Sequence, residues 1–216
     1  MRQRRDRSPR GDGRKRLTAQ DWADAALTAM GEGGLAAVAV EPLAARLGTT
    51  KGSFYWHFAN REALIEAALD RWEQRSTEAV IAGLESEPDP EKRLRRLLSE
   101  ASELAAEDPL EVSLLATAGH PRVAAALRRV TERRVGYLAE LFAQLGFAPD
   151  EGRRRALLAY TGYLGHTQLA HAVPETLPAG EEGRRYLDSV LDTLLAQGTA
   201  EPRSSSAGSA GPCAGA

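Results

Sequence analysis

The chain has 216 residues, of which 43% are hydrophobic and 27% are charged, and its formal net charge is −2. This length allows one or two ordinary domains, and the composition is that of an average soluble globular protein. No apolar run is long enough for a transmembrane helix, no apolar stretch follows the basic N-terminus as in a secretory signal, and the single cysteine, Cys213, cannot form an internal disulfide. We therefore expect a cytoplasmic protein that does not contact a membrane.

The small net charge hides an asymmetry along the chain. Residues 1–61 carry 11 Lys and Arg against 6 Asp and Glu, a balance of +5, whereas residues 62–216 carry 17 against 24, a balance of −7. A basic end suggests contact with nucleic acid or a membrane surface. Residues 1–16 are mostly Arg, Gly and Asp, and residues 199–216 are mostly Ser, Gly, Ala and Pro, so we expect a disordered basic arm and a disordered tail.

The residues between these ends favour helices almost throughout. Ala, Leu, Arg and Glu dominate, and alternating stretches of β-branched residues are absent, which predicts an all-α fold. The first helix is expected to follow Thr18, which resembles a capping box together with Asp21. Two short helices are expected over 40–47 and 51–58, with Gly48 in the left-handed conformation after the first of them. Two short helices joined by so tight a turn are typical of the helix-turn-helix motif.

The second of these short helices holds four of the twelve aromatic residues of the chain within five positions. Phe54 and Phe58 are four residues apart and share a helix face, so we expect them to anchor the helix in the core. Tyr55 and Trp56 then lie away from that face, and large exposed aromatic side chains indicate a partner.

We expect this helix to read DNA in the major groove. Lys51 and Ser53 lie near its N-terminal end and can bond base edges, while Gly52 lets the backbone approach closely. The other candidates are expected at phosphates, which position a protein without reading sequence. The predicted DNA contacts are Thr18, Thr49, Thr50, Lys51, Gly52, Ser53, Tyr55, Trp56, His57 and Arg61.

The rest of the chain predicts a larger helical body. A long helix is expected from Arg61, after an Asn60 cap, to about Leu84. Further helices are expected over 90–107, 109–118, 121–145, 150–172 and 181–197. The basic run Arg128, Arg129, Arg133 and Arg134 is expected to be a solvated helix face.

Residues 17–72, above all GTTKGSFYWHFANREALIEAALDRW at 48–72, resemble the N-terminal DNA-binding domain of TetR-family transcriptional regulators. The family pattern is met by Leu47, Gly48, Ser53, Phe54, Tyr55, His57, Phe58, Arg61, Ala63 and Leu64. Ala39 departs from it, because it offers the second helix no polar cap. The resemblance implies a helix-turn-helix domain over 17–63 and a helical ligand-binding and dimerisation domain over 64–198.

The resemblance also implies a function. The protein would be a sequence-specific DNA-binding regulator, and more often a repressor, released from a near-palindromic operator by a small-molecule effector. Its last two long helices would pair with those of a second subunit, and a two-fold homodimer would place two reading helices about 34 Å apart, one turn of DNA. Candidate residues for the effector pocket are Trp72, Leu115, Tyr137, Tyr160, Tyr163, His166, Gln168 and His171.

Two other classes of function remain open at this point. The first is a helical adaptor that binds protein and not DNA, which would not need a cation and exposed aromatic residues around one short helix. The second is an all-helical enzyme, but the sequence shows no nucleophile elbow, phosphate-binding loop or HExxH motif. His166 and His171 are five residues apart rather than four, so no metal site and no cofactor are expected.

Overall fold

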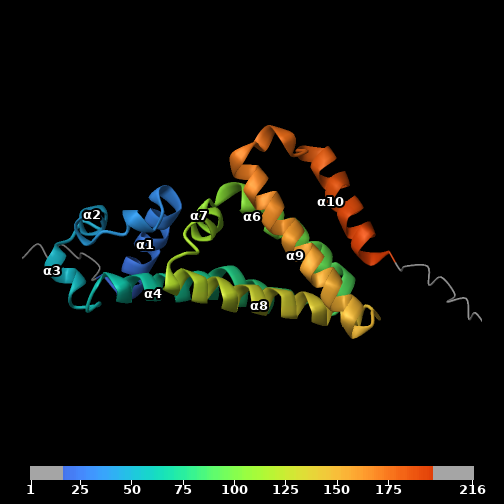
Figure 1. The fold of residues 1–216 in the computed structure, drawn as a ribbon, viewed down its shortest axis with the longest axis horizontal. Coiled ribbons are helices and arrows are strands. Elements are labelled where there is room, and N and C mark those ends of the chain that lie inside the picture. Colours follow the sequence, from blue (N-terminus) through green and yellow to red (C-terminus); the bar gives the residue numbers. More distant parts are fainter. Residues whose placement is uncertain (1–16, 197–216) are drawn as a thin grey trace, which may run out of the picture.

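The computed structural model describes residues 17–196, and these residues form helices and connecting turns without a strand (Figure 1). The all-α class predicted from composition and periodicity is confirmed. The predicted basic arm over 1–16, the tail over 199–216 and Cys213 lie outside the described residues. None of the helices over 17–196 is both long and apolar enough to cross a lipid bilayer.

The helices keep the order expected from the sequence. They are α1 (Ala19–Gly33), α2 (Val40–Arg46), α3 (Lys51–Phe54), α4 (Arg61–Glu73), α5 (Ala79–Leu84), α6 (Pro90–Glu107), α7 (Leu110–Ala116), α8 (Pro121–Gln144), α9 (Pro149–Ala172) and α10 (Gly180–Leu195). Short 3₁₀ turns lie at Leu35–Ala37 and Pro174–Thr176, and a π-helical segment at Gln74–Glu78 joins α4 to α5. In Figure 1, α2 and α3 lie at one end of the molecule, and α9 and α10 lie toward the other.

Several helix ends follow from local side-chain chemistry. Thr18 accepts a hydrogen bond from the Asp21 amide at 3.2 Å, and the Asp21 carboxylate accepts one from the Thr18 amide at 2.7 Å, so the predicted capping box is confirmed. Gly34 ends α1 with a positive φ of 69°. Asn60 caps α4 by accepting from the Ala63 amide at 2.9 Å. Ala39 gives α2 no side-chain cap, as expected.

Two expected helices differ from the structure. α3 ends at Phe54 rather than at Phe58, and the amides of His57 and Phe58 both bond the Phe54 carbonyl in a turn. The turn lets both phenylalanine rings enter the core, where they stack with centroids 5.7 Å apart. The expected continuous α-helix over 61–84 is interrupted by the π-helical segment, where the Ala79 amide bonds the Gln74 carbonyl.

The hydrophobic side chains form two clusters. The first joins α1, α2, α3 and α4 with α7 and the first half of α8, and Trp22 meets Phe54 in it edge to face at 5.4 Å. The second joins α5, α6, the second half of α8, α9 and α10. The first cluster continues along α4, through the fully buried Leu64 and Ile65, to Trp72. The domain boundary predicted at 63–64 stays a prediction, and the first hydrophobic cluster extends across it.

Candidate DNA interface and ligand cavity

α2 and α3 form a helix-turn-helix unit. Gly48 adopts a φ of 63° between them, and its amide and that of Thr49 bond the Ala45 and Ala44 carbonyls at the end of α2. Only a residue that tolerates positive φ fits this turn without strain. Phe54, fully buried beneath α3, fixes the short helix on the core.

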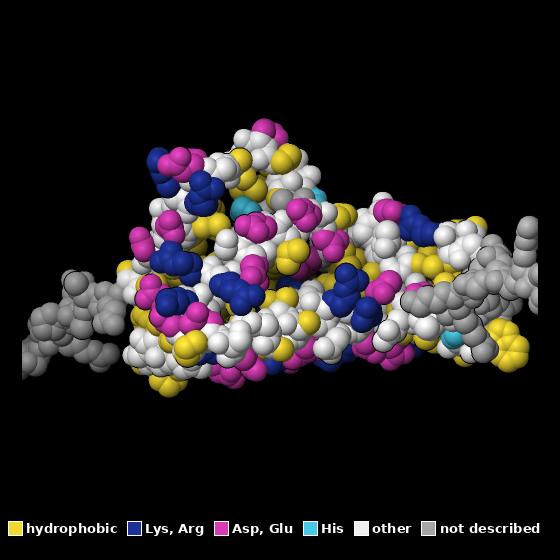
Figure 2. Space-filling model, turned by 180° about the vertical axis from the view of Figure 1, so that it is seen from behind, with side chains coloured by type: hydrophobic (Ala, Val, Ile, Leu, Met, Phe, Trp, Pro, Cys, Tyr) yellow, Lys and Arg dark blue, Asp and Glu magenta, His cyan; other side chains and the backbone are white. Residues whose placement is uncertain are grey.

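None of the ten predicted DNA contacts is buried, and eight of them, within 49–57, lie in α3 or next to it in the sequence. Trp56 is 84% exposed and Tyr55 is 56% exposed. The exposed members are Thr18, Thr50, Lys51, Gly52, Tyr55 and Trp56, and the partly exposed members are Thr49, Ser53, His57 and Arg61. Figure 2 shows hydrophobic side chains projecting at the α3 end, whereas basic and acidic side chains alternate over the helical body. An exposed indole of this size has no packing role in the described part of the chain.

Lys51 and Thr18 have exposed partners within the protein. The Lys51 ammonium lies 2.6 Å from the Glu41 carboxylate of α2, and this hydrogen bond raises the pKa of Lys51 and lowers that of Glu41. The Thr18 hydroxyl donates to the Asp21 carboxylate at 2.7 Å. Both contacts are exposed, so DNA phosphates can compete for these side chains.

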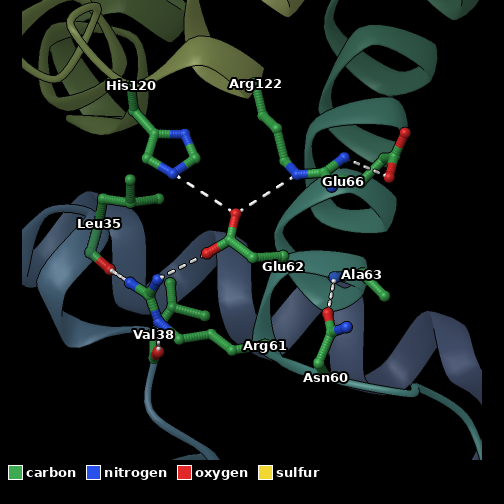
Figure 3. Close-up of polar contacts among 9 residues, drawn as sticks. All are labelled: Leu35, Val38, Asn60, Arg61, Glu62, Ala63, Glu66, His120 and Arg122. Carbon is green, nitrogen blue, oxygen red and sulfur yellow. Dashed lines mark hydrogen bonds and ion pairs between the residues drawn. The ribbon is translucent and has the colours of Figure 1, made fainter.

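Arg61 has internal partners that the sequence did not indicate (Figure 3). Its Nε donates to the Val38 carbonyl at 2.7 Å and its Nη2 to the Leu35 carbonyl at 2.5 Å. Its Nη1 lies 3.1 Å from the Glu62 carboxylate. The guanidinium thus joins the start of α4 to the turn before α2, and its predicted contact with DNA stays a prediction.

The same cluster reaches the body of the protein. Glu62 turns toward the start of α8, where the Arg122 Nε lies 3.3 Å and the His120 Nε2 lies 3.5 Å from its carboxylate (Figure 3). Arg122 also pairs with Glu66 at 2.5 Å. A continuous set of polar contacts therefore connects α8 with the turn that carries the helix-turn-helix unit.

A cavity of about 500 Å³ lies in the helical body between α1, α4, α5, α6, α7, α8 and α9. This volume is within the usual range for small-molecule sites. Most of its wall is apolar, with contributions from Leu27, Val80, Ile81, Leu97, Leu98, Leu104, Leu110 and Leu138. The π-helical segment forms part of the wall through Ser76 and Thr77.

Four of the eight predicted pocket residues line this cavity: Trp72, Tyr137, Tyr160 and Tyr163. The other four, Leu115, His166, Gln168 and His171, do not line it. His166 instead stacks on Tyr186 of α10 with ring centroids 6.4 Å apart, and burial lowers its pKa. Of the four that line it, Trp72 lies on α4, Tyr137 on α8, and Tyr160 and Tyr163 on α9.

The polar part of the cavity wall is a buried ion pair. The Arg134 Nη1 lies 2.7 Å from Glu111 Oε1, and the two side chains are only 14% and 8% exposed. The Tyr163 hydroxyl donates to Glu111 Oε2 at 2.8 Å. Burial and the nearby carboxylate raise the pKa of Tyr163, so its hydroxyl stays protonated and donates this bond.

The expectation of a solvated basic face over 128–134 is wrong for Arg134. This side chain occupies an inward position, four residues from both Val130 and Leu138, which are buried. That spacing was the available signal, because an arginine at an apolar position of a helix needs an internal partner. Arg129 and Arg133 also pair across the helices, with Glu73 at 2.8 Å and Glu78 at 3.0 Å.

The fold and the site define a class of protein: an all-helical chain with an N-terminal helix-turn-helix unit and a cavity in its body. Residues 23–68 match the family described as bacterial regulatory proteins, tetR family. The N-terminal part of the chain therefore matches the TetR family, whose members are DNA-binding transcriptional regulators rather than enzymes.

Solved structures share this fold. A transcriptional regulator from Rhodococcus sp. Rha1 has 22% identity and a TM-score of 0.66, covering 83% of this chain and 94% of its own. FadR from Bacillus subtilis, solved in complex with stearoyl-CoA, has 15% identity and a TM-score of 0.61, with 83% and 98% covered. SmeT, the repressor of the Stenotrophomonas maltophilia multidrug efflux pump SmeDEF, has 21% identity and a TM-score of 0.61, with 83% and 89% covered. No curated protein matches the chain significantly.

Proposed function

We propose that this TetR-family protein is a homodimeric repressor that binds a near-palindromic operator and releases it when a small molecule occupies the cavity. The observation that carries the DNA-binding part is the exposure of Trp56, Tyr55 and Lys51 around a helix held rigidly by Phe54. Major-groove recognition uses such a helix, with cations and hydrogen-bonding side chains at its N-terminal end. The ten predicted contacts around α3 form the proposed DNA interface.

The exposed apolar side chains of α9 and α10 support a homodimer. Leu157, Leu158, Leu169 and Tyr186 are all exposed, and they lie on the two helices farthest along the chain. A group of large apolar side chains on one face is typical of an interface. Since one short helix binds DNA weakly, two copies related by two-fold symmetry would supply the affinity and explain an operator with two half-sites.

The contacts of α4 and α8 support a structural connection by which a ligand in the cavity could shift the DNA interface. α4 carries Arg61 near α3 and Trp72 in the cavity wall, and the π-helical segment continues it. α8 carries Arg134 in the same wall and Arg122 against Glu62. A ligand that displaces Arg134 would shift both helices and change the spacing of the two reading helices. FadR was solved with an acyl-CoA and SmeT represses an efflux pump, which supports a ligand-responsive repressor.

One experiment tests the DNA-binding function. Full-length protein is used to select bound duplexes from a random DNA pool, and the W56A variant is carried through the same selection. We expect enrichment of a two-fold symmetric site by the wild-type protein and little enrichment by the variant. A wild-type selection that enriches no sequence would instead favour the helical adaptor.

A further inference from the structure

We propose that the cavity excludes anionic ligands and accepts a largely apolar molecule whose polar group is a cation or a hydrogen-bond donor directed at Glu111. This inference rests on the proposed function, in which the cavity holds the effector. It concerns the chemical class of that effector, and it follows from how the charges of the wall are already paired.

Arg134, the cation deep in the wall among the residues that the structure describes, is already neutralised by the protein. Arg134 donates from Nη1 to Glu111 at 2.7 Å and from Nε to the Thr77 hydroxyl at 3.0 Å. Its Nη2 donates to the Ser76 carbonyl at 3.2 Å and to the Ser76 hydroxyl at 3.1 Å. A guanidinium has five N–H donors, and these contacts use most of them. Little capacity remains to bind a carboxylate or phosphate.

The Glu111 carboxylate can accept further hydrogen bonds. Each of its two oxygens has one donor, Arg134 for Oε1 and Tyr163 for Oε2, whereas a carboxylate accepts about four hydrogen bonds. The residue is only 7% exposed and lines the cavity. Since the Glu111–Arg134 pair carries no net charge, the spare acceptor sites of Glu111 set the preference: a donor or cation can bond to them, whereas an anion would be buried there without a partner.

The charged side chains of the outer wall are also paired. Asp24 pairs with Arg71 and Arg75 at 3.1 Å, Glu32 with Arg46 at 2.5 Å and Glu100 with Arg96 at 2.6 Å. Arg75, the guanidinium among these lining residues, therefore already has a carboxylate partner. The multiply charged stearoyl-CoA seen in FadR therefore does not fit this wall.

A series of probes with one apolar chain and three headgroups tests the proposal. Decylamine, decanol and decanoate are titrated into the full-length protein at neutral pH, and binding is followed by calorimetry. We expect decylamine and decanol to bind and decanoate to bind roughly tenfold more weakly or not at all. Decanoate binding as tightly as decylamine would overturn the proposal and leave the ligand-binding function standing.

A variant with the opposite headgroup preference tests whether Glu111 causes the discrimination. E111Q leaves Arg134 without its counter-ion, so decanoate should gain roughly tenfold in affinity and decylamine should lose a similar factor. E78Q is the matched control, because it removes the partner of Arg133 outside the cavity and should leave all three affinities unchanged. Equal effects of the two variants would contradict a role for Glu111.

The design does not depend on E111Q folding, because the ranking of the three probes by the wild-type protein is decisive by itself. If none of the three probes binds, both the ligand class and the ligand-binding function fail. The DNA selection described above would still report on the operator-binding function.

Discussion

Arg61 at the first position of α4 donates to the Val38 carbonyl at 2.7 Å, so its guanidinium fixes the backbone just before α2. The sequence predicted a phosphate contact for this arginine, because it lies at a helix N-terminus beside the recognition helix. The structure gives it a role in positioning the helix-turn-helix unit within the free protein. A positioning role and a DNA-contacting role predict different effects when Arg61 is substituted.

R61A should destabilise the protein even without DNA. Loss of the bonds to the Val38 and Leu35 carbonyls should lower the free energy of unfolding by about 1–3 kcal/mol, measured by urea denaturation. The control is R46A, which breaks an exposed ion pair with Glu32 and should cost about 0–1 kcal/mol. Unchanged stability of R61A would mean that the guanidinium does not hold this turn.

W56A should weaken DNA binding without affecting folding. The side chain is 84% exposed, so its removal should change the free energy of unfolding by less than about 0.5 kcal/mol. Affinity for the selected operator, measured by electrophoretic mobility shift at fixed salt, should fall because a contact around the recognition helix is lost. An unaltered affinity would remove Trp56 from the DNA interface.

F54A, unlike W56A, should destabilise the protein. Phe54 is fully buried between Trp22 and Phe58, and truncating it should cost about 3–5 kcal/mol. Denaturation should show the loss, and W56A serves as the control two positions away. A cost below that of W56A would contradict the anchoring of α3 by this ring.

L158D should give a monomer. A carboxylate at this position, where the leucine is 59% exposed on α9, would be desolvated in the proposed interface between subunits. Sedimentation should report half the mass, and operator affinity should fall by about a hundredfold or more because the two half-sites are no longer bound together. L115D, on α7, is the control and should stay dimeric.

Much of the local structure could be predicted because its causes are close in sequence. The Thr18–Asp21 capping box, the positive φ of Gly48 and the Asn60 cap of α4 each involve residues within four positions. The same range covers the density of aromatic residues over 54–58, which led to the DNA-binding function. Such signals can be recognised without knowledge of the tertiary packing.

The cavity could be predicted only in part. The family resemblance suggested four aromatic residues that line it, but Arg134 meets Glu111, 23 residues away, and Thr77, 57 residues away. No pattern in the sequence pairs residues at such distances. The π-helical segment has no distinct sequence signal either, and it determines which side chains of this stretch face Arg134.

By itself, the sequence determined the order of the helices, the helix-turn-helix unit and the exposure of its aromatic residues, because caps, turns and periodicity act over one or two helical turns. Only the tertiary structure decided the internal role of Arg61 and the charge of the cavity wall. The reason is that a charged side chain takes the partner that packing brings within reach, and burial decides how strongly the two charges interact.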